Sequence, residues 1–467
     1  MNPTGHNICA FGLDLICAVE WRKPRAERGG DRVGRLLRFK VGKTRRDIDR
    51  TLRFVIRAAA RNSSGYRRLL DEGGASPDRV RGVEDLRWLP IVDKETLFRR
   101  FPLEEVLHRR AAPHRCIRVG TSGSTGLPMN VFMSRAEARF RTLLVLESWR
   151  RTARLRLPLV VGDVGSWVEG GETEVRRHGG IGKVVRISIG LPVERQVEEV
   201  LRHRPQVLSG YPTALQVLGE TFRDVAVSRP FLRLVAVRGE VLHLETRDAL
   251  EGAFGCRVAD YYNSEEMGNM AWECPADSAT MHVNTDGCVL EVSDANGDPL
   301  PVGAEGRVIV TNLFNCTMPF VRYDLHDRGI ILHPGGERCA CGSFRPRMAV
   351  VQGRDDDFVR LPDGRTVSPR LIATAVNRAF SGRSPLGGFD SHFRRFQVVQ
   401  DALDHLTIRI VPEPGGSIDF QGVLGSAMRR IHPDFRTSVQ LVDGLELEPS
   451  GKFRKVISLI ERGADET

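Results

Sequence analysis

The stretch Gly120-Thr-Ser-Gly-Ser-Thr-Gly126 stands between two short runs that read as strands, residues 116–119 and 129–133. Its glycines allow successive backbone N–H groups to converge on an anion, and its hydroxyls add further donors, so the loop suits the phosphates of ATP. It lacks the Gly-Lys-Ser/Thr ending of a Walker loop and opens no helix directly, which excludes a P-loop NTPase. If the loop is considered alone, the alternative interpretation is a flexible turn.

The residues around this loop predict a layered α/β domain. Ser134 stands three residues before Glu137, a capping box that should open a helix running towards Arg151. Between residues 160 and 259, short apolar runs such as Leu234-Val-Ala-Val237 alternate with helical stretches such as residues 193–202. A β-rich segment should follow, because residues 294–301 and 307–311 have the pattern of turns and strands.

Length and composition fit a globular protein of two or three domains. The chain has 467 residues, of which 41% are hydrophobic and 27% charged. We place a domain boundary after Gly353-Arg-Asp-Asp-Asp357, near the turn Leu361-Pro-Asp-Gly364. The expected domains are residues 1–354, with a basic helical lead-in over 1–85, and a small α+β domain over 355–467.

The charge excess favours phosphorylated partners without identifying one. Lys and Arg number 69 against 59 Asp and Glu, a net charge of +10. Arginines between residues 21 and 67 suggest a nucleic-acid patch, but aromatic residues barely interleave with them and Asp47 and Asp49 interrupt them. A solvated helix face is the better interpretation, so we expect no nucleic-acid partner.

The sequence also predicts a cytoplasmic protein that does not enter the membrane. The best apolar stretch, residues 8–19, is broken by Asp14 and falls short of the roughly 20 residues that cross a bilayer. It has neither a basic leader nor a small-residue cleavage site. Nine cysteines are an odd count, which disfavours a secreted disulfide scaffold.

Further motifs follow the loop in a recognisable order. They are Tyr261-Tyr-Asn-Ser-Glu265, Arg322-Tyr323 followed by Asp327, Gly353-Arg354 followed by Asp356-Asp357, and Pro449-Ser-Gly-Lys452. In this order and spacing the chain resembles the adenylate-forming ligase superfamily. Each motif alone is weak, whereas the ordered set is specific.

A second set of segments resembles one branch of that superfamily. The segments are Leu89-Pro-Ile-Val-Asp-Lys94, Gly239-Glu240, Met267-Gly-Asn-Met-Ala-Trp-Glu-Cys274 and Cys339-Ala-Cys-Gly342. They look like the phenylacetate-CoA ligase branch, which includes adenylating proteins of capsular polysaccharide clusters. The resemblance covers about residues 89–455.

The resemblance implies a fold and a reaction in two steps. The fold is a large layered adenylation domain followed by a small mobile domain. In the first step a carboxylate attacks the α-phosphate of ATP and pyrophosphate leaves; in the second, a nucleophile displaces AMP. The implied cofactors are ATP or AMP and Mg²⁺, the substrate is a small acid, aryl by analogy with the branch, and coenzyme A is the co-substrate.

The resemblance also implies roles for individual residues. Lys452 and Glu265 would be catalytic, the lysine through charge stabilisation near the α-phosphate and the glutamate as a ligand of Mg²⁺. Asp327 would accept hydrogen bonds from the ribose hydroxyls, and Arg354 lies at the hinge. The remaining nucleotide-binding candidates are Thr121, Ser122, Gly123, Ser124, Thr125, Gly126, Gly239, Glu240, Tyr261, Tyr262, Asn263 and Ser264.

Two positions depart from the superfamily pattern. Met129 stands where many members have lysine, although this branch often lacks it. Tyr262 replaces the usual glycine after the first tyrosine, which leaves the substrate open.

A separate set of residues predicts a metal site. Cys274, His282, Cys339 and Cys341 offer thiolates and an imidazole, the ligands of structural Zn²⁺, and four of them fill a tetrahedral site. The alternative is a set of reduced, buried cysteines, because Cys-x-Cys is looser evidence than Cys-x-x-Cys.

The sequence leaves alternatives open for the acceptor of the acyl group and for the class of function. An adenylating enzyme could instead use an amine, a carrier-protein thiol, or an inorganic acid activated for N–N bond formation. A non-enzymatic alternative is a basic nucleic-acid-binding or scaffold protein, but Glu265, Asp327 and Lys452 together speak against it. The oligomeric state is open, with a homodimer as one option.

Overall fold

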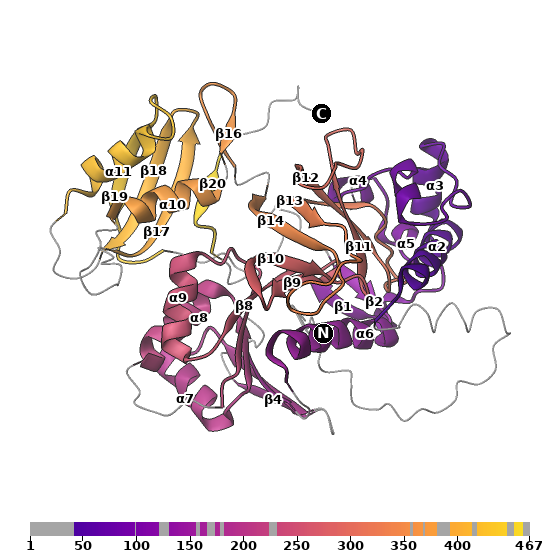
Figure 1. Ribbon diagram of the computed structural model, residues 1–467, viewed down its shortest axis with the longest axis horizontal. Coiled ribbons are helices and arrows are strands. Elements are labelled where there is room, and N and C mark those ends of the chain that lie inside the picture. Colours follow the sequence, from indigo (N-terminus) through magenta and orange to yellow (C-terminus); the bar gives the residue numbers. More distant parts are fainter. Residues whose placement is uncertain are drawn as a thin grey trace. The chain divides into compact units, whose positions relative to one another are not determined.

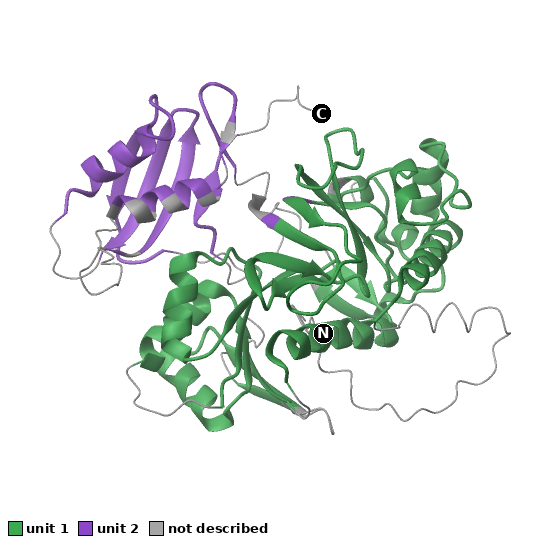
Figure 2. Cartoon of the chain, viewed as in Figure 1, with its two compact units in different colours: residues 1–325, 329–349 green, residues 326–328, 350–467 purple. Residues whose placement is uncertain are grey.

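The computed structural model describes most of the chain from residue 42 onward. The described residues are 42–98, 100–120, 130–155, 159–165, 173–177, 182–223, 231–354, 358–367, 369–380, 393–412, 418–445 and 453–460. They form two compact units, residues 1–325 with 329–349, and residues 326–328 with 350–467 (Figure 2). The division falls inside β14 (Arg347–Arg354), a few residues before the boundary that the sequence suggests.

The described part of the first unit starts with a group of helices (Figure 1). They are α2 (Arg45–Asn62), α3 (Ser64–Glu72), η2 (Val83–Trp88), α4 (Lys94–Phe98), α5 (Leu103–Val106) and η3 (Pro113–Arg115). Thr44 caps α2 through a capping box with Asp47, and Leu52, Val55 and Ile56 form its buried face. Residues 45–62 of the arginine-rich segment therefore form an amphipathic helix with a solvated basic face.

A hairpin and a long helix follow. Strands β1 (Ile117–Gly120) and β2 (Asn130–Met133) pair antiparallel, with Gly120 opposite Asn130. Helix α6 (Arg135–Ala153) then starts at a capping box formed by Ser134 and Glu137. The predicted order of strand, loop, strand and helix is confirmed at both flanks, while the loop itself lies outside the described residues.

A 12-stranded sheet forms the centre of the first unit, in the order β11-β12-β13-β14-β10-β9-β8-β7-β6-β3-β5-β4. Its other strands are β3 (Leu159–Gly165), β4 (Glu174–Arg177), β5 (Gly182–Ser188), β6 (Val207–Gly210), β7 (Leu234–Arg238), β8 (Val258–Ser264), β9 (Gly268–Cys274), β10 (Asp277–Val283), β11 (Cys288–Ser293), β12 (Glu305–Asn312) and β13 (Tyr323–His333). Strands β5, β3, β6, β7 and β8 run parallel, so their carboxyl ends meet at one edge.

Helices cover both faces of the parallel part. Helices α7 (Val193–His203), α8 (Pro212–Arg223) and α9 (Leu244–Phe254) pack on one face, in a core with Val235 and Val258. On the other face, Val145 and Trp149 of α6 pack against Ala236 and Tyr261. The layered α/β architecture that the sequence predicts is confirmed, and ligands of such sheets bind at the carboxyl ends of the strands.

The second unit has its own sheet and core. Its elements are β15 (Val359–Arg360), β16 (Thr366–Val367), α10 (Pro369–Phe380), β17 (Phe393–Ala402), β18 (His405–Pro412), α11 (Phe420–Arg429), β19 (Arg436–Leu441) and β20 (Val456–Ser458). The sheet order is β19-β18-β17-β20, and residues such as Phe396, Ile408 and Leu424 are buried between it and the helices. The unit is the small α+β domain that the sequence predicts.

No helix among the described residues is long and apolar enough to cross a membrane. The apolar stretch at residues 8–19 lies outside the described part of the chain.

The capping box of α6 generates a prediction about stability. The buried Glu137 carboxylate accepts hydrogen bonds from the backbone N–H groups of Ser134 and Cys316 at 2.8 and 2.9 Å, and from the Thr317 hydroxyl. We expect Glu137→Ala to lower the free energy of unfolding by about 2–4 kcal/mol, because it removes a helix cap and leaves buried donors without that acceptor. Urea denaturation measures the loss.

The matched control is Glu147→Ala on the same helix. Glu147 pairs with Arg150 and Arg151 near the surface, so its loss should cost only about 0–1 kcal/mol. Equal losses for the two variants would contradict the role given to Glu137.

Candidate active site

The tyrosine-containing motif occupies the end of β8, and its two tyrosines face opposite sides. Tyr261 is buried in the core beside Trp149 and Trp272. Tyr262 is half-buried on the other face of the strand. The side chain of Tyr261 is therefore part of the hydrophobic core, whereas Tyr262 is the one of the pair that is accessible.

Glu265 lies in the turn between β8 and β9, where an arginine holds it. Nη2 of Arg141, from α6, lies 2.9 Å from Oε2 of Glu265. The same guanidinium donates to the backbone carbonyls of Glu265 and Ser264, at 3.0 and 3.4 Å. The Arg141 side chain is 8% exposed and that of Glu265 is 21% exposed, so the pair is screened from water on the arginine side.

Gly239 and Glu240 follow directly after β7. Gly239 has a φ of 76°, which a residue with a Cβ adopts only with strain. The Glu240 carboxylate accepts hydrogen bonds from the Thr213 hydroxyl at 2.8 Å and from the Thr213 backbone N–H at 3.2 Å, at the start of α8. These hydrogen bonds hold the turn that follows β7 against the start of α8.

A buried polar group that the motifs do not include lies at the same edge of the sheet. Arg238, the last residue of β7, donates to Asp163 of β3 and Ser209 of β6, at 2.8 and 2.7 Å. Its guanidinium lies 5.8 Å from the centre of the Tyr211 ring. A polar or charged residue near the end of each otherwise apolar run, Asp163, Ser209 and Arg238, is the signal that sequence reasoning overlooked.

The two aspartates of β13 have different surroundings. Asp324 is buried, pairs with Arg307, and donates its backbone N–H to the Val92 carbonyl at 2.8 Å, so it supports the fold. Asp327 is half-buried, and the preceding His326 has a φ of 58°. The ribose-binding role of Asp327 stays a prediction.

Several predicted site residues lie outside the described part of the chain. These are the phosphate loop, Thr121 to Gly126, and Lys452; the side chain of Arg354 is likewise not described. The pairing of Gly120 with Asn130 brings together the two ends of the segment that contains the loop. The chemical roles of these residues stay predictions.

The four predicted metal ligands come together. The ligand atoms of Cys274, His282, Cys339 and Cys341 lie within 4.8 Å of one another. Cys274 ends β9 and His282 lies in β10, while the other two come from the segment before β14. Burial lowers the pKa of His282 to about 4, so its ring is neutral, the form that binds a metal ion.

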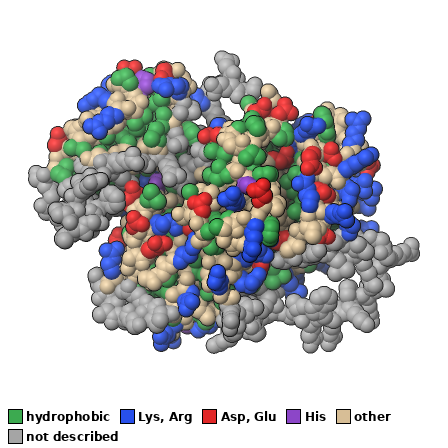
Figure 3. Space-filling model, in the orientation of Figure 1, with side chains coloured by type: hydrophobic (Ala, Val, Ile, Leu, Met, Phe, Trp, Pro, Cys, Tyr) green, Lys and Arg blue, Asp and Glu red, His purple; other side chains and the backbone are tan. Residues whose placement is uncertain are grey.

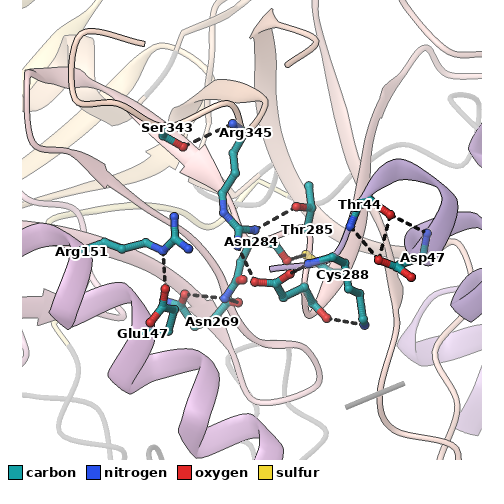
Figure 4. Close-up of polar contacts among 12 residues, drawn as sticks. Thr44, Asp47, Glu147, Arg151, Asn269, Asn284, Thr285, Cys288, Ser343 and Arg345 are labelled. Carbon is teal, nitrogen blue, oxygen red and sulfur yellow. Dashed lines mark hydrogen bonds and ion pairs between the residues drawn. The ribbon is translucent and has the colours of Figure 1, made fainter. Parts of the chain in front are cut away.

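Arg345 fastens the segment that follows this cluster (Figure 4). Its guanidinium donates to the Thr285 hydroxyl at 2.8 Å and pairs with Asp286. It also lies 5.3 Å from the centre of the Trp272 ring. The loop that carries Cys339 and Cys341 is thereby anchored to the sheet.

Comparisons with known proteins agree with this geometry. The chain is 31% identical to a phenylacetate-coenzyme A ligase of Thermus thermophilus over 309 residues, which cover 63% of this chain and 66% of that enzyme, just under two thirds. No protein-family model matches the chain.

Solved structures share the fold over nearly the whole chain. A 2-hydroxyisobutyryl-CoA ligase in its postadenylation state, in complex with an acyl-AMP, superposes with a TM-score of 0.71 at 21% identity, covering 90% of this chain and 91% of that one. An amide bond synthetase from Marinactinospora thermotolerans gives a TM-score of 0.53 at 17% identity, over 78% and 74%.

The chain is a homologue of phenylacetate-CoA ligases. Its fold is that of a solved CoA ligase. Glu265 and Gly239-Glu240 lie at the edge of the sheet where parallel strands end, and ligands of α/β sheets bind at such edges.

The buried ion pair between Arg238 and Asp163 gives a prediction about stability. We expect Asp163→Ala to lower the free energy of unfolding by about 3–5 kcal/mol, because Arg238 loses its buried counter-charge. Replacing both partners, in Asp163→Ala/Arg238→Met, should recover part of the loss. Urea titration of the variants measures it, and a loss below about 1 kcal/mol would mean that the pair behaves as a surface pair.

Proposed function

We propose that this chain is an ATP-dependent ligase that activates a carboxylic acid as an acyl-adenylate and transfers the acyl group to coenzyme A. The similarity to a phenylacetate-CoA ligase carries the proposal. The ordered motifs support it, because Glu265 and the Gly239-Glu240 turn lie at ends of neighbouring strands, β8 and β7.

In the first step the chain must bind ATP and orient it towards the acid. The hydroxyls and N–H groups of residues 121–126 would hold the phosphates, and Asp327 would accept hydrogen bonds from the ribose. Gly239 and Glu240 would flank the adenine. Tyr262, Asn263 and Ser264 would line the same edge, since all three are at least partly accessible.

Glu265 fits a role as the ligand of Mg²⁺. Its carboxylate is partly exposed, and the ion pairs and hydrogen bonds of the described residues engage only Oε2. A carboxylate oxygen is a preferred ligand of Mg²⁺, which would neutralise charge on the phosphates.

Lys452 would stabilise the negative charge that grows as pyrophosphate leaves. It precedes β20 of the small unit. In the second step this unit would withdraw the lysine, with a hinge near residues 356–363, and coenzyme A would displace AMP. If coenzyme A does not react with the acyl-adenylate, an amine or a carrier-protein thiol would be the acceptor.

We also propose that the Cys274, His282, Cys339 and Cys341 cluster binds a structural zinc ion. Four protein ligands leave no open position for a substrate. Burial raises the pKa of Cys274 to about 12, so a bound cation is what would keep it as a thiolate. Cys274 ends β9 while the Glu265 turn precedes Gly268, so the seven residues of β9 separate the two sites by about 20 Å.

ATP–pyrophosphate exchange tests the proposed function without requiring the acceptor. The panel should contain aryl, aliphatic, hydroxy and inorganic acids. We expect exchange that depends on one class of carboxylic acid and on Mg²⁺. Absence of exchange with every acid would overturn the proposal, and exchange with only an inorganic acid would replace it with the N–N bond alternative.

We expect Lys452→Ala to slow adenylation by about 2–4 kcal/mol in activation free energy, because the ammonium stabilises charge only in that step. Transfer from a supplied acyl-adenylate should stay near the wild-type rate. The two rates are measured separately, by exchange and by release of AMP. Lys455→Ala is the matched control, because the Lys455 ammonium lies 4.9 Å from the centre of the Phe396 ring within the small unit. Equal damage to both steps by Lys452→Ala would show a structural role.

For the metal, we expect about one equivalent of zinc in protein prepared without chelator. Cys341→Ser should lower both the zinc content and the melting temperature, whereas Cys116→Ser, outside the cluster, should change neither. Elemental analysis and thermal denaturation give the two readouts. Much less than one equivalent in the wild type would contradict the site.

A further inference from the structure

One guanidinium organises the turn that carries Glu265. The Arg141 side chain comes from the middle of α6 and reaches the β8–β9 connection, more than 120 positions further along the chain. It donates to three acceptors there: the Glu265 carboxylate and the carbonyls of Glu265 and Ser264. Arginine suits this task because its donors form a rigid planar fork.

The turn is shaped to fit this side chain. Gly268 has a φ of 74°, and a Cβ there would lie only 3.1 Å from Cγ and 3.2 Å from Nε of Arg141. The Ser264 hydroxyl accepts a hydrogen bond from the Met267 backbone N–H at 3.1 Å, which closes the same turn. The backbone from Ser264 to Gly268 is therefore fixed against Arg141 from two sides.

The contact leaves part of the Glu265 carboxylate accessible. Arg141 engages Oε2, while Oε1 has no hydrogen bond or ion pair within the described part of the chain. The arginine side chain is 8% exposed and the glutamate side chain 21% exposed. Arg141 thus holds Oε2 of Glu265, while the Glu265 side chain remains partly exposed to solvent.

We propose that Arg141 is a positioning residue, which orients Glu265 so that its other oxygen can bind the Mg²⁺ of MgATP. This inference rests on the proposed function, because it assigns a support to the metal ligand of that reaction. Groups that hold metal-binding carboxylates fix their orientation, and losing one costs about 10–100-fold in metal affinity. Arg141 touches neither nucleotide nor metal in this assignment and acts only through Glu265.

The test compares ATP affinity with and without the metal. A non-hydrolysable ATP analogue is titrated into the full-length chain by calorimetry, once with excess Mg²⁺ and once with EDTA. For the wild type we expect Mg²⁺ to tighten binding. Arg141→Gln should lose about 10–100-fold of affinity in the Mg²⁺ arm and change little in the EDTA arm.

Two further variants separate positioning from stability and from charge. Arg141→Lys keeps the positive charge but loses the fork, so it should weaken the Mg²⁺ arm as Arg141→Gln does. Arg150→Gln is the matched control, an exposed arginine of the same helix that pairs with Glu147, and it should bind like the wild type. Melting temperatures verify that every variant is folded.

A double-mutant cycle with Glu265→Gln decides whether Arg141 acts through the glutamate. We expect Arg141→Gln/Glu265→Gln to bind no more weakly than Glu265→Gln alone. Additive losses, a wild-type Mg²⁺ effect in Arg141→Gln, or equal losses in both arms would overturn the positioning role. A wild type that binds no ATP analogue in either arm would instead overturn the proposed function, and the inference with it.

Discussion

The attachment of helix α6 to its surroundings is the constraint on which the organisation of the first unit depends. Three of its side chains reach three different parts of the chain. Glu137 binds the backbone at Cys316, Arg141 binds the turn at Glu265, and Trp149 packs in the core with Tyr261. These contacts hold the start of α6 and the β8–β9 turn together, although more than 100 residues separate them in the chain. Because all three side chains are buried, the frame resists small displacements.

Local sequence patterns made several helices and strands of the first unit predictable. The capping box at Ser134 and Glu137, the apolar run of β7 and the helical stretch at residues 193–202 each depend on local spacing. Each is found where the pattern predicts it, with the last helix ending one residue later, at His203. The meeting of Cys274, His282, Cys339 and Cys341 was predictable for another reason. Cysteine and histidine are uncommon residues with a narrow set of uses, so their identity narrows the chemistry even when the positions are distant.

The long-range ion pairs could not be predicted in this way. Lys and Arg together number 69, and nothing in the local sequence distinguishes Arg141 or Arg238 from those on the surface. Their partners, Glu265 and Asp163, lie far away along the chain and meet them only once the sheet has formed. The sequence also could not predict which tyrosine of the motif faces the core. The register of β8 decides this, because it places Tyr261 opposite Trp272.

These buried pairs also bear on the net charge of +10. Arg238 and Arg322 are buried against Asp163 and Glu291, and Arg141 against Glu265, so part of the basic composition serves the interior. On the described surface in Figure 3, basic and acidic side chains are interspersed. Buried ion pairs therefore account for part of the arginine content of the described residues.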